Sequence, residues 1–301
     1  MNNILNNLET SLDEGKFCFT AELVPPLAAS AGRLLAEADA LRGRVEAINV
    51  TDGAAARTTM SSVAAATLLA VNHIEPVLQL TCRDRNRIAL CADLVGCAAF
   101  GVSNLLLLTG DDPANGDQPE AKAVHDINST ALMAIARDMS AQGALPNGRE
   151  IDPPPHFHIG SADVPRHHSG TEAPPALVKK IDAGARFIQT QLCYDIDLVE
   201  AYIGKMGEWG LLDRVKILIG LGPVASARSA RWMRDNLWGV AMPDPLIQRL
   251  EGSPHPKQEG RRICIELIER MQKMEGIAGV HLMAPGQSAA SIASLLSELG
   301  K

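Results

Sequence analysis

The chain has 301 residues, of which 46% are hydrophobic, so it is long enough and apolar enough to bury a large core. Its formal net charge is −7 and no basic block offsets it, which argues against nucleic acid and membranes as partners. No apolar stretch reaches membrane length and the N-terminus lacks a signal-peptide pattern, so we expect a cytoplasmic protein. The six cysteines form no C-x-x-C pair, which indicates reduced core thiols.

The chain opens with a polar segment for which we predict a helix over about residues 2–14. The stretch Phe17 to Pro26 then has the composition of a buried strand, which Pro25-Pro26 stops because proline cannot donate to a ladder. Seven more short apolar strands are predicted at 45–51, 76–81, 104–108, 156–161, 187–192, 215–221 and 280–283. Helices are predicted between and after them at 30–43, 58–71, 84–99, 126–142, 174–183, 195–207, 226–236, 258–275 and 287–299.

This alternation of short strands and helices predicts a single-domain (β/α)8 barrel spanning residues 1–301. A doubly wound sheet is the alternative, but no G-x-G-x-x-G follows the first strand.

Residues at about 237–257 form a turn-rich insertion. The insertion is rich in apolar side chains, which predict an interface in a homo-oligomer, either a dimer or a tetramer. These side chains are Leu237, Trp238, Val240, Met242, Leu246 and Ile247.

A barrel of this kind carries its site at the carboxyl ends of the strands. Three polar side chains at those ends, Glu22, Asp111 and Gln191, are expected to converge on one mouth. Two acids and an amide suit proton transfer and the recognition of a ligand with several nitrogen and oxygen edges. His156 and His158 lie two apart on one predicted strand and face the same side, but no third ligand accompanies them, so we predict no metal site.

Short motifs follow one another over roughly residues 17–285: Ala21-Glu22-Leu23-Val24-Pro25-Pro26, Asn49-Val50-Thr51-Asp52-Gly53, Leu80-Thr81-Cys82, Leu108-Thr109-Gly110-Asp111, Lys180-Ile181-Asp182-Ala183-Gly184-Ala185 with Thr190-Gln191, and Gly279-Val280-His281. In this order they resemble the motifs of the methylenetetrahydrofolate reductase family, in the short bacterial form that consists of the catalytic barrel alone. Each motif is weak alone, and the ordered set is specific.

The resemblance implies reduction of 5,10-methylenetetrahydrofolate to 5-methyltetrahydrofolate, with hydride passing from NADH or NADPH through bound FAD. Glu22 would act as general acid and Asp111 would position the folate and tune the flavin. The implied folate-binding residues are Gln191, Asp111, Gln189 and His281. The implied FAD-binding residues are Thr51, Gln79, Thr81, Thr109, Gly110, Asp111, Ser161, His167 and Lys180.

Two departures from the family pattern concern the cofactor. Gln79 stands where the family often has histidine, and Thr109 stands where it often has arginine. Direct hydride transfer without a flavin is therefore an alternative. Two further alternatives for the function are a non-redox, pterin-binding methyltransferase and a partner subunit in one-carbon metabolism.

Overall fold

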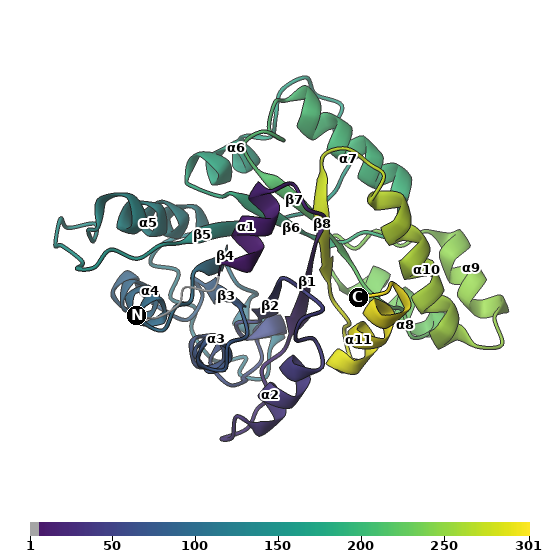
Figure 1. The fold of residues 1–301 in the computed structure, drawn as a ribbon, viewed down its shortest axis with the longest axis horizontal. Coiled ribbons are helices and arrows are strands. Elements are labelled where there is room, and N and C mark those ends of the chain that lie inside the picture. The colour runs from purple at the N-terminus through teal and green to yellow at the C-terminus, as the bar shows by residue number, and fades with distance from the viewer. Residues whose placement is uncertain (1–5) are drawn as a thin grey trace.

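The computed structural model describes residues 6–301 and contains one closed barrel of eight parallel strands in chain order (Figure 1). The strands are β1 (Cys18–Leu23), β2 (Ala47–Val50), β3 (Pro76–Thr81), β4 (Asn104–Leu108), β5 (His158–Asp163), β6 (Phe187–Leu192), β7 (Lys216–Leu221) and β8 (Ile277–Leu282). β1 pairs with both β2 and β8, which closes the sheet. The predicted (β/α)8 barrel is confirmed.

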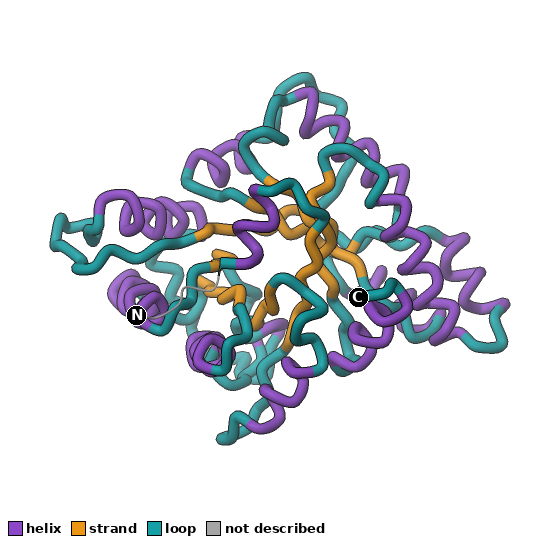
Figure 2. The backbone as a smooth tube through the Cα atoms, in the orientation of Figure 1, coloured by secondary structure: helices purple, strands orange, loops and turns teal. Residues whose placement is uncertain are grey.

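Helices follow the strands and surround the barrel (Figure 2). They are α1 (Asn7–Asp13), α2 (Gly32–Asp39), α3 (Ser62–Val71), α4 (Arg87–Ala99), α5 (Ser129–Gln142), α6 (Pro175–Asp182), α7 (Ile196–Glu208), α8 (Ala227–Asn236), α9 (Asp244–Gly252), α10 (Pro256–Met271) and α11 (Ala289–Glu298). Two short 3-10 helices, η1 (Ala54–Ala56) and η2 (Pro113–Asn115), lie in the loops after β2 and β4. In residues 6–301, no helix combines the length and apolarity needed to cross a bilayer.

The predicted insertion contains a helix, α9, rather than turns alone. Met242, Leu246 and Ile247 are buried in the chain's own core, so these side chains of the expected oligomer surface are not available to a second subunit. Trp238 is 76% exposed. All six cysteines are free and buried, as their spacing indicated.

Helix α1 closes the amino end of the barrel. Leu8 and Leu12 are 0% and 1% exposed, and they pack on a cluster of buried strand side chains: Cys18, Ala47, Val77, Leu106, Phe187 and Leu218. The carboxylate of Glu75 accepts hydrogen bonds from the N–H groups of Asn7 (2.6 Å) and Leu8 (2.9 Å) at the start of α1. The start of the predicted helix, residues 2–5, lies outside the described residues.

Because α1 fills the barrel end opposite the predicted site, truncating Leu12 should affect stability and not activity. We expect Leu12→Ala to lower the free energy of unfolding by about 3 kcal/mol, the usual cost of a leucine-sized cavity. Chemical denaturation of the two proteins measures this loss. Ile88→Ala, at an 80% exposed position, is the control and should change stability by less than about 0.5 kcal/mol. Equal losses in the two variants would contradict the role of α1.

Candidate active site

Glu22 lies at the carboxyl end of β1, with 24% of its side chain exposed. Its Oε2 atom accepts a hydrogen bond of 3.0 Å from Nε2 of Gln79 on β3. Nε2 of His281 on β8 lies 3.8 Å from the same oxygen. Within residues 6–301, Oε1 of Glu22 forms no hydrogen bond. One carboxylate oxygen is thus fixed by the barrel, and the other is free to meet a ligand.

The ring of His281 is held through its other nitrogen. Thr20 accepts a hydrogen bond from Nε2 of Gln189 (3.0 Å), and its Oγ1 lies 2.9 Å from Nδ1 of His281. This contact leaves Nε2 of His281 on the side of Glu22.

Gln189 supports this arrangement from inside the barrel. Its side-chain amide and that of Asn49 exchange two hydrogen bonds, of 2.6 and 3.0 Å, and both residues are at most 2% exposed. The side-chain amide of Gln189 is therefore bonded to Asn49 and Thr20, deeper in the barrel than Glu22. Gln189, which was predicted to bind the substrate, thus lies beneath the mouth.

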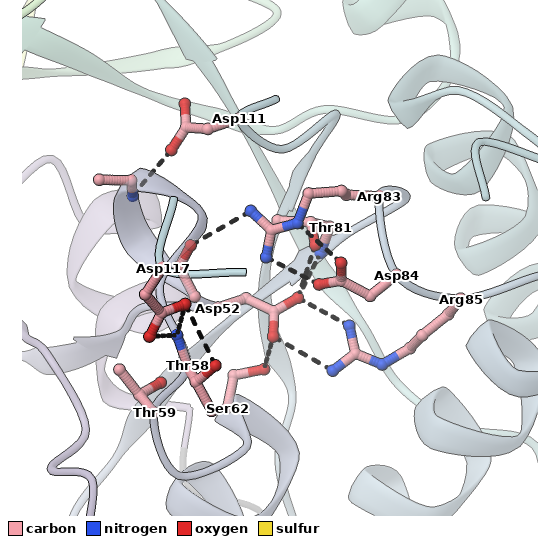
Figure 3. A network of polar contacts seen from close by, with 12 residues as sticks. Asp52, Thr58, Thr59, Ser62, Thr81, Arg83, Asp84, Arg85, Asp111 and Asp117 are labelled. Carbon is pink, nitrogen blue, oxygen red and sulfur yellow. Dashed lines mark hydrogen bonds and ion pairs between the residues drawn. The ribbon is translucent and has the colours of Figure 1, made fainter. Parts of the chain in front are cut away.

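Asp111 and Gln191 occupy the same rim as Glu22 but are held by different loops. Oδ2 of Asp111 accepts a hydrogen bond of 2.9 Å from the N–H of Ala55 (Figure 3). Nε2 of Gln191 donates to the carbonyl of Trp238 at 3.0 Å. In the described part of the chain, no hydrogen bond joins Glu22, Asp111 and Gln191 directly. A ligand that contacts all three would have to span the mouth.

The loops after β2 and β4 are fastened together beside Asp111. The backbone N–H of Thr58 donates to both oxygens of Asp117 at 3.0 Å, and its hydroxyl donates at 3.2 Å (Figure 3). A Cβ atom on Gly116 would lie 1.9 Å from the carbonyl oxygen of Ala56, so only glycine permits this approach. The contact fixes the loop that carries Asp111.

A buried ion pair anchors the same region. Asp52, at 7% exposure, accepts hydrogen bonds from both terminal nitrogens of Arg85, at 2.7 and 3.1 Å (Figure 3). It also accepts from Ser62 (2.8 Å) and from the N–H and hydroxyl of Thr81 (2.8 and 2.9 Å). Burial raises the pKa of Asp52, but the hydrogen bonds and charge of Arg85, together with the hydrogen bonds from Thr81 and Ser62, outweigh burial, so the pKa lies below its usual value. Arg85 was not among the site residues predicted from the sequence.

Two of the predicted cofactor residues have donors available for a ligand. The Thr51 hydroxyl is buried and has no partner within the described residues. Lys180 donates one hydrogen bond, of 2.7 Å, to the carbonyl of Ala162 on β5, which leaves two of its N–H groups free.

Gly110 has a φ of 96°, and a Cβ there would lie 2.8 Å from Cβ of Arg83, so this position requires glycine. His167 is exposed on the loop after β5.

The other predicted cofactor residues use their side chains within the protein. Gln79 binds Glu22, and Thr81 binds Asp52. The Ser161 hydroxyl donates to the carbonyl of Ala162 at 3.3 Å, and Ser161 is 1% exposed. Thr109 lies with its hydroxyl 3.4 Å from that of Ser129, the first residue of α5.

The two candidate metal-binding histidines have separate partners. His156 precedes β5, so its predicted place on the strand is wrong, and its Nε2 lies 2.6 Å from Oε2 of Glu9. His158 lies with Nδ1 3.0 Å from Oδ1 of Asn104, and burial lowers the pKa of His158 to about 3. Among residues 6–301, no group of three or more histidine, cysteine or acidic side chains is arranged to hold a metal ion.

The fold and site thus define a (β/α)8 barrel whose mouth presents a fixed carboxylate beside polar rim residues. The profile of the family described as "Methylenetetrahydrofolate reductase" matches residues 7–300, and the chain belongs to that family.

Two relatives illustrate the similarity in sequence. The chain is 28% identical over 249 residues to "Methylenetetrahydrofolate reductase 2" of Schizosaccharomyces pombe, covering 77% of this chain and 36% of the relative. It is 25% identical over 252 residues to "Probable methylenetetrahydrofolate reductase (NADPH)" of Caenorhabditis elegans. This match covers 81% of this chain and 35% of the relative. The chain thus spans about a third of the length of these relatives.

A solved structure shares the fold. It is described as an uncharacterized protein from Clostridium thermocellum that binds two copies of 5-methyl-5,6,7,8-tetrahydrofolic acid. Its TM-score is 0.69 at 12% identity, with 97% of this chain and 98% of that chain covered.

Proposed function

We propose that this chain reduces 5,10-methylenetetrahydrofolate to 5-methyltetrahydrofolate with NADH or NADPH. The observation that carries the proposal is Glu22, whose Oε2 accepts a hydrogen bond from Gln79 and lies 3.8 Å from His281 while its Oε1 is free. Membership of the reductase family and the names of the relatives support the same reaction. A folate-binding protein of the same fold supports the substrate class.

Glu22 supplies the proton in this proposal. Oε1 delivers it to N10 of the folate, which breaks the bond between N10 and the bridging carbon and leaves that carbon as an iminium on N5. Hydride then adds to this carbon and forms the methyl group. Because Gln79 donates a hydrogen bond to Oε2, the carboxyl group keeps its orientation as the proton leaves. We assign Asp111, which follows β4, and Gln191, on β6, to the polar edges of the pterin.

The donors on the rim fit a flavin dinucleotide. The unpartnered Thr51 hydroxyl offers a hydrogen bond, and the free N–H groups of Lys180 suit a phosphate oxygen. We propose FAD as the cofactor, with Thr51, Gly110, Asp111, His167 and Lys180 as its contacts. When bound, FAD supplies the redox chemistry that relays hydride from the nicotinamide. Thr109 and Ser161, whose hydroxyls bind within the protein, are not part of this proposed set.

The contribution of Lys180 can be tested by cofactor retention. We expect Lys180→Met to weaken FAD binding by about tenfold, because a charge-assisted hydrogen bond is lost. Equilibrium titration followed by flavin fluorescence measures the dissociation constant. Lys179→Met is the matched control, because Lys179 is the exposed neighbour on the same helix and should leave the constant unchanged. Similar constants for both variants would overturn the assignment of Lys180.

The absorption spectrum of the purified protein, recorded anaerobically before and after adding NADH, tests the cofactor proposal. We expect flavin bands that bleach with NADH. A colourless protein that oxidises NADH only when methylenetetrahydrofolate is present would instead establish direct hydride transfer. A protein that is colourless and inactive, even with added FAD, would favour the methyltransferase or the partner-subunit alternative.

A further inference from the structure

A cavity of about 570 Å³ opens beside Glu22, which forms part of its lining. It lies between the segment that runs from β1 into α2 and the segment that runs from β8 into α11. Its lining includes Glu22 to Leu27, Arg33, Glu37, Ala284 to Ala289 and Ile292. None of the proposed FAD contacts lines it. The cavity therefore offers space for a part of a ligand that extends from Glu22 in another direction.

The wall of this cavity is largely apolar. Val24 and Leu27 are 58% and 75% exposed, unusually high for large hydrophobic side chains in one short segment. Pro25 and Pro26 lie between them and also line the cavity. Proline fixes the backbone here, so the exposed side chains are presented on a stiff segment. Such a wall suits an aromatic ring that has left water.

The cavity also carries an unpaired positive charge. Arg33, the second residue of α2, is exposed and forms no hydrogen bond or ion pair with any residue in 6–301. Glu37, an acid on the same helix, is engaged instead, because its Oε2 accepts a hydrogen bond of 2.6 Å from the N–H of Ala289 at the start of α11. An anionic group bound in this cavity would therefore find Arg33 available.

We propose that this cavity binds the p-aminobenzoylglutamate part of the folate, with Arg33 as a specificity-determining residue that holds a glutamate carboxylate. The aromatic ring lies on the wall formed by Val24 to Leu27, while the reacting carbon stays at Glu22. This inference rests on the proposed function, since it takes the substrate to be a folate. The glutamate takes no part in the chemistry, so Arg33 binds ground state and transition state alike and affects KM rather than kcat.

Removing the charge of Arg33 should weaken substrate binding selectively. For Arg33→Met we expect the KM for methylenetetrahydrofolate to rise about tenfold, with kcat and the KM for the nicotinamide unchanged. The analogue 5,10-methylenetetrahydropteroate, which lacks the glutamate, should show the same KM with both proteins. Arg149→Met, at an exposed arginine in the loop before β5, is the control and should match the unaltered chain.

Three outcomes would overturn the assignment of Arg33. One is an unchanged KM for the folate, and another is a rise that persists with the truncated analogue. The third is a rise in the KM for the nicotinamide instead, which would assign the arginine to a cofactor phosphate.

A binding measurement separates this inference from the proposed function. Calorimetric titration with 5-methyltetrahydrofolate requires no turnover, and Arg33→Met should again weaken binding about tenfold. If the unaltered chain failed to reduce any folate but showed this difference, the proposed function would fail and the cavity assignment would stand. If both proteins bound equally while the unaltered chain was active, the cavity assignment alone would fail.

Discussion

Glu22→Gln should lower kcat for methylenetetrahydrofolate reduction by about 10³-fold, within the usual contribution of a general acid. Glutamine keeps the shape of the side chain and can still contact Gln79 and His281, but it carries no proton that can be transferred to N10. Binding of folate and nicotinamide should change little, because the loss concerns the transition state. Steady-state kinetics of the purified variant measure the effect.

The control for this variant is Glu208→Gln, which neutralises an acid that is 62% exposed on α7 and should leave kcat unchanged. Measurement of 5-methyltetrahydrofolate binding by the Glu22 variant tests whether the site is intact. A variant that binds normally and still turns over at more than about a tenth of the original rate would remove Glu22 from the acid role.

Arg85→Met should lower the free energy of unfolding by about 3 kcal/mol, because it leaves the buried carboxylate of Asp52 without its cation. Thr81 and Ser62 still donate to Asp52 in the variant, but they supply no charge. Arg262→Met, which breaks a pair whose arginine side chain is 71% exposed, is the control and should lose less than about 1 kcal/mol. Urea denaturation of the three proteins compares them.

The pH dependence gives a second test of this ion pair. The pKa of Asp52 is lower in the folded chain than in the unfolded chain, where it is about 4. The ionised carboxylate therefore contributes its full stabilisation above about pH 4, and this stabilisation is lost as the pH falls through the lower pKa of the folded chain. The difference in stability between the unaltered chain and Arg85→Met should therefore be largest near neutral pH and shrink in acid. A difference that stayed constant down to the acid limit of folding would show that Asp52 is not its source.

The barrel could be predicted from the sequence because short apolar strands alternate with amphipathic helices. Three strands, β3, β4 and β6, have the predicted bounds. Glu22 could be placed at the carboxyl end of β1 because Pro25-Pro26 marks the end of that strand. The helix α9 was missed because Gly239, Pro243 and Gly252 surround a short apolar pattern.

The partners of the site residues were harder to predict. Glu22 meets Gln79 and His281 only because strands far apart in the sequence close into a ring. For other residues a usable signal existed. His158 and Ser161 lie three apart on one strand and so face opposite sides, which means that they could not both point into the barrel. Arg33 lies in the first turn of the helix after β1, and helix starts after barrel strands lie on the side of the site.

The central claim is that this chain transfers hydride from a nicotinamide to a folate. The most direct test is an anaerobic incubation with NADH or NADPH and 5,10-methylenetetrahydrofolate, with FAD present, in which oxidised nicotinamide and 5-methyltetrahydrofolate are both quantified. We predict that the two appear in equal amounts and that neither appears when the folate is left out. Nicotinamide oxidation without 5-methyltetrahydrofolate, or no reaction with either nicotinamide, would contradict the claim.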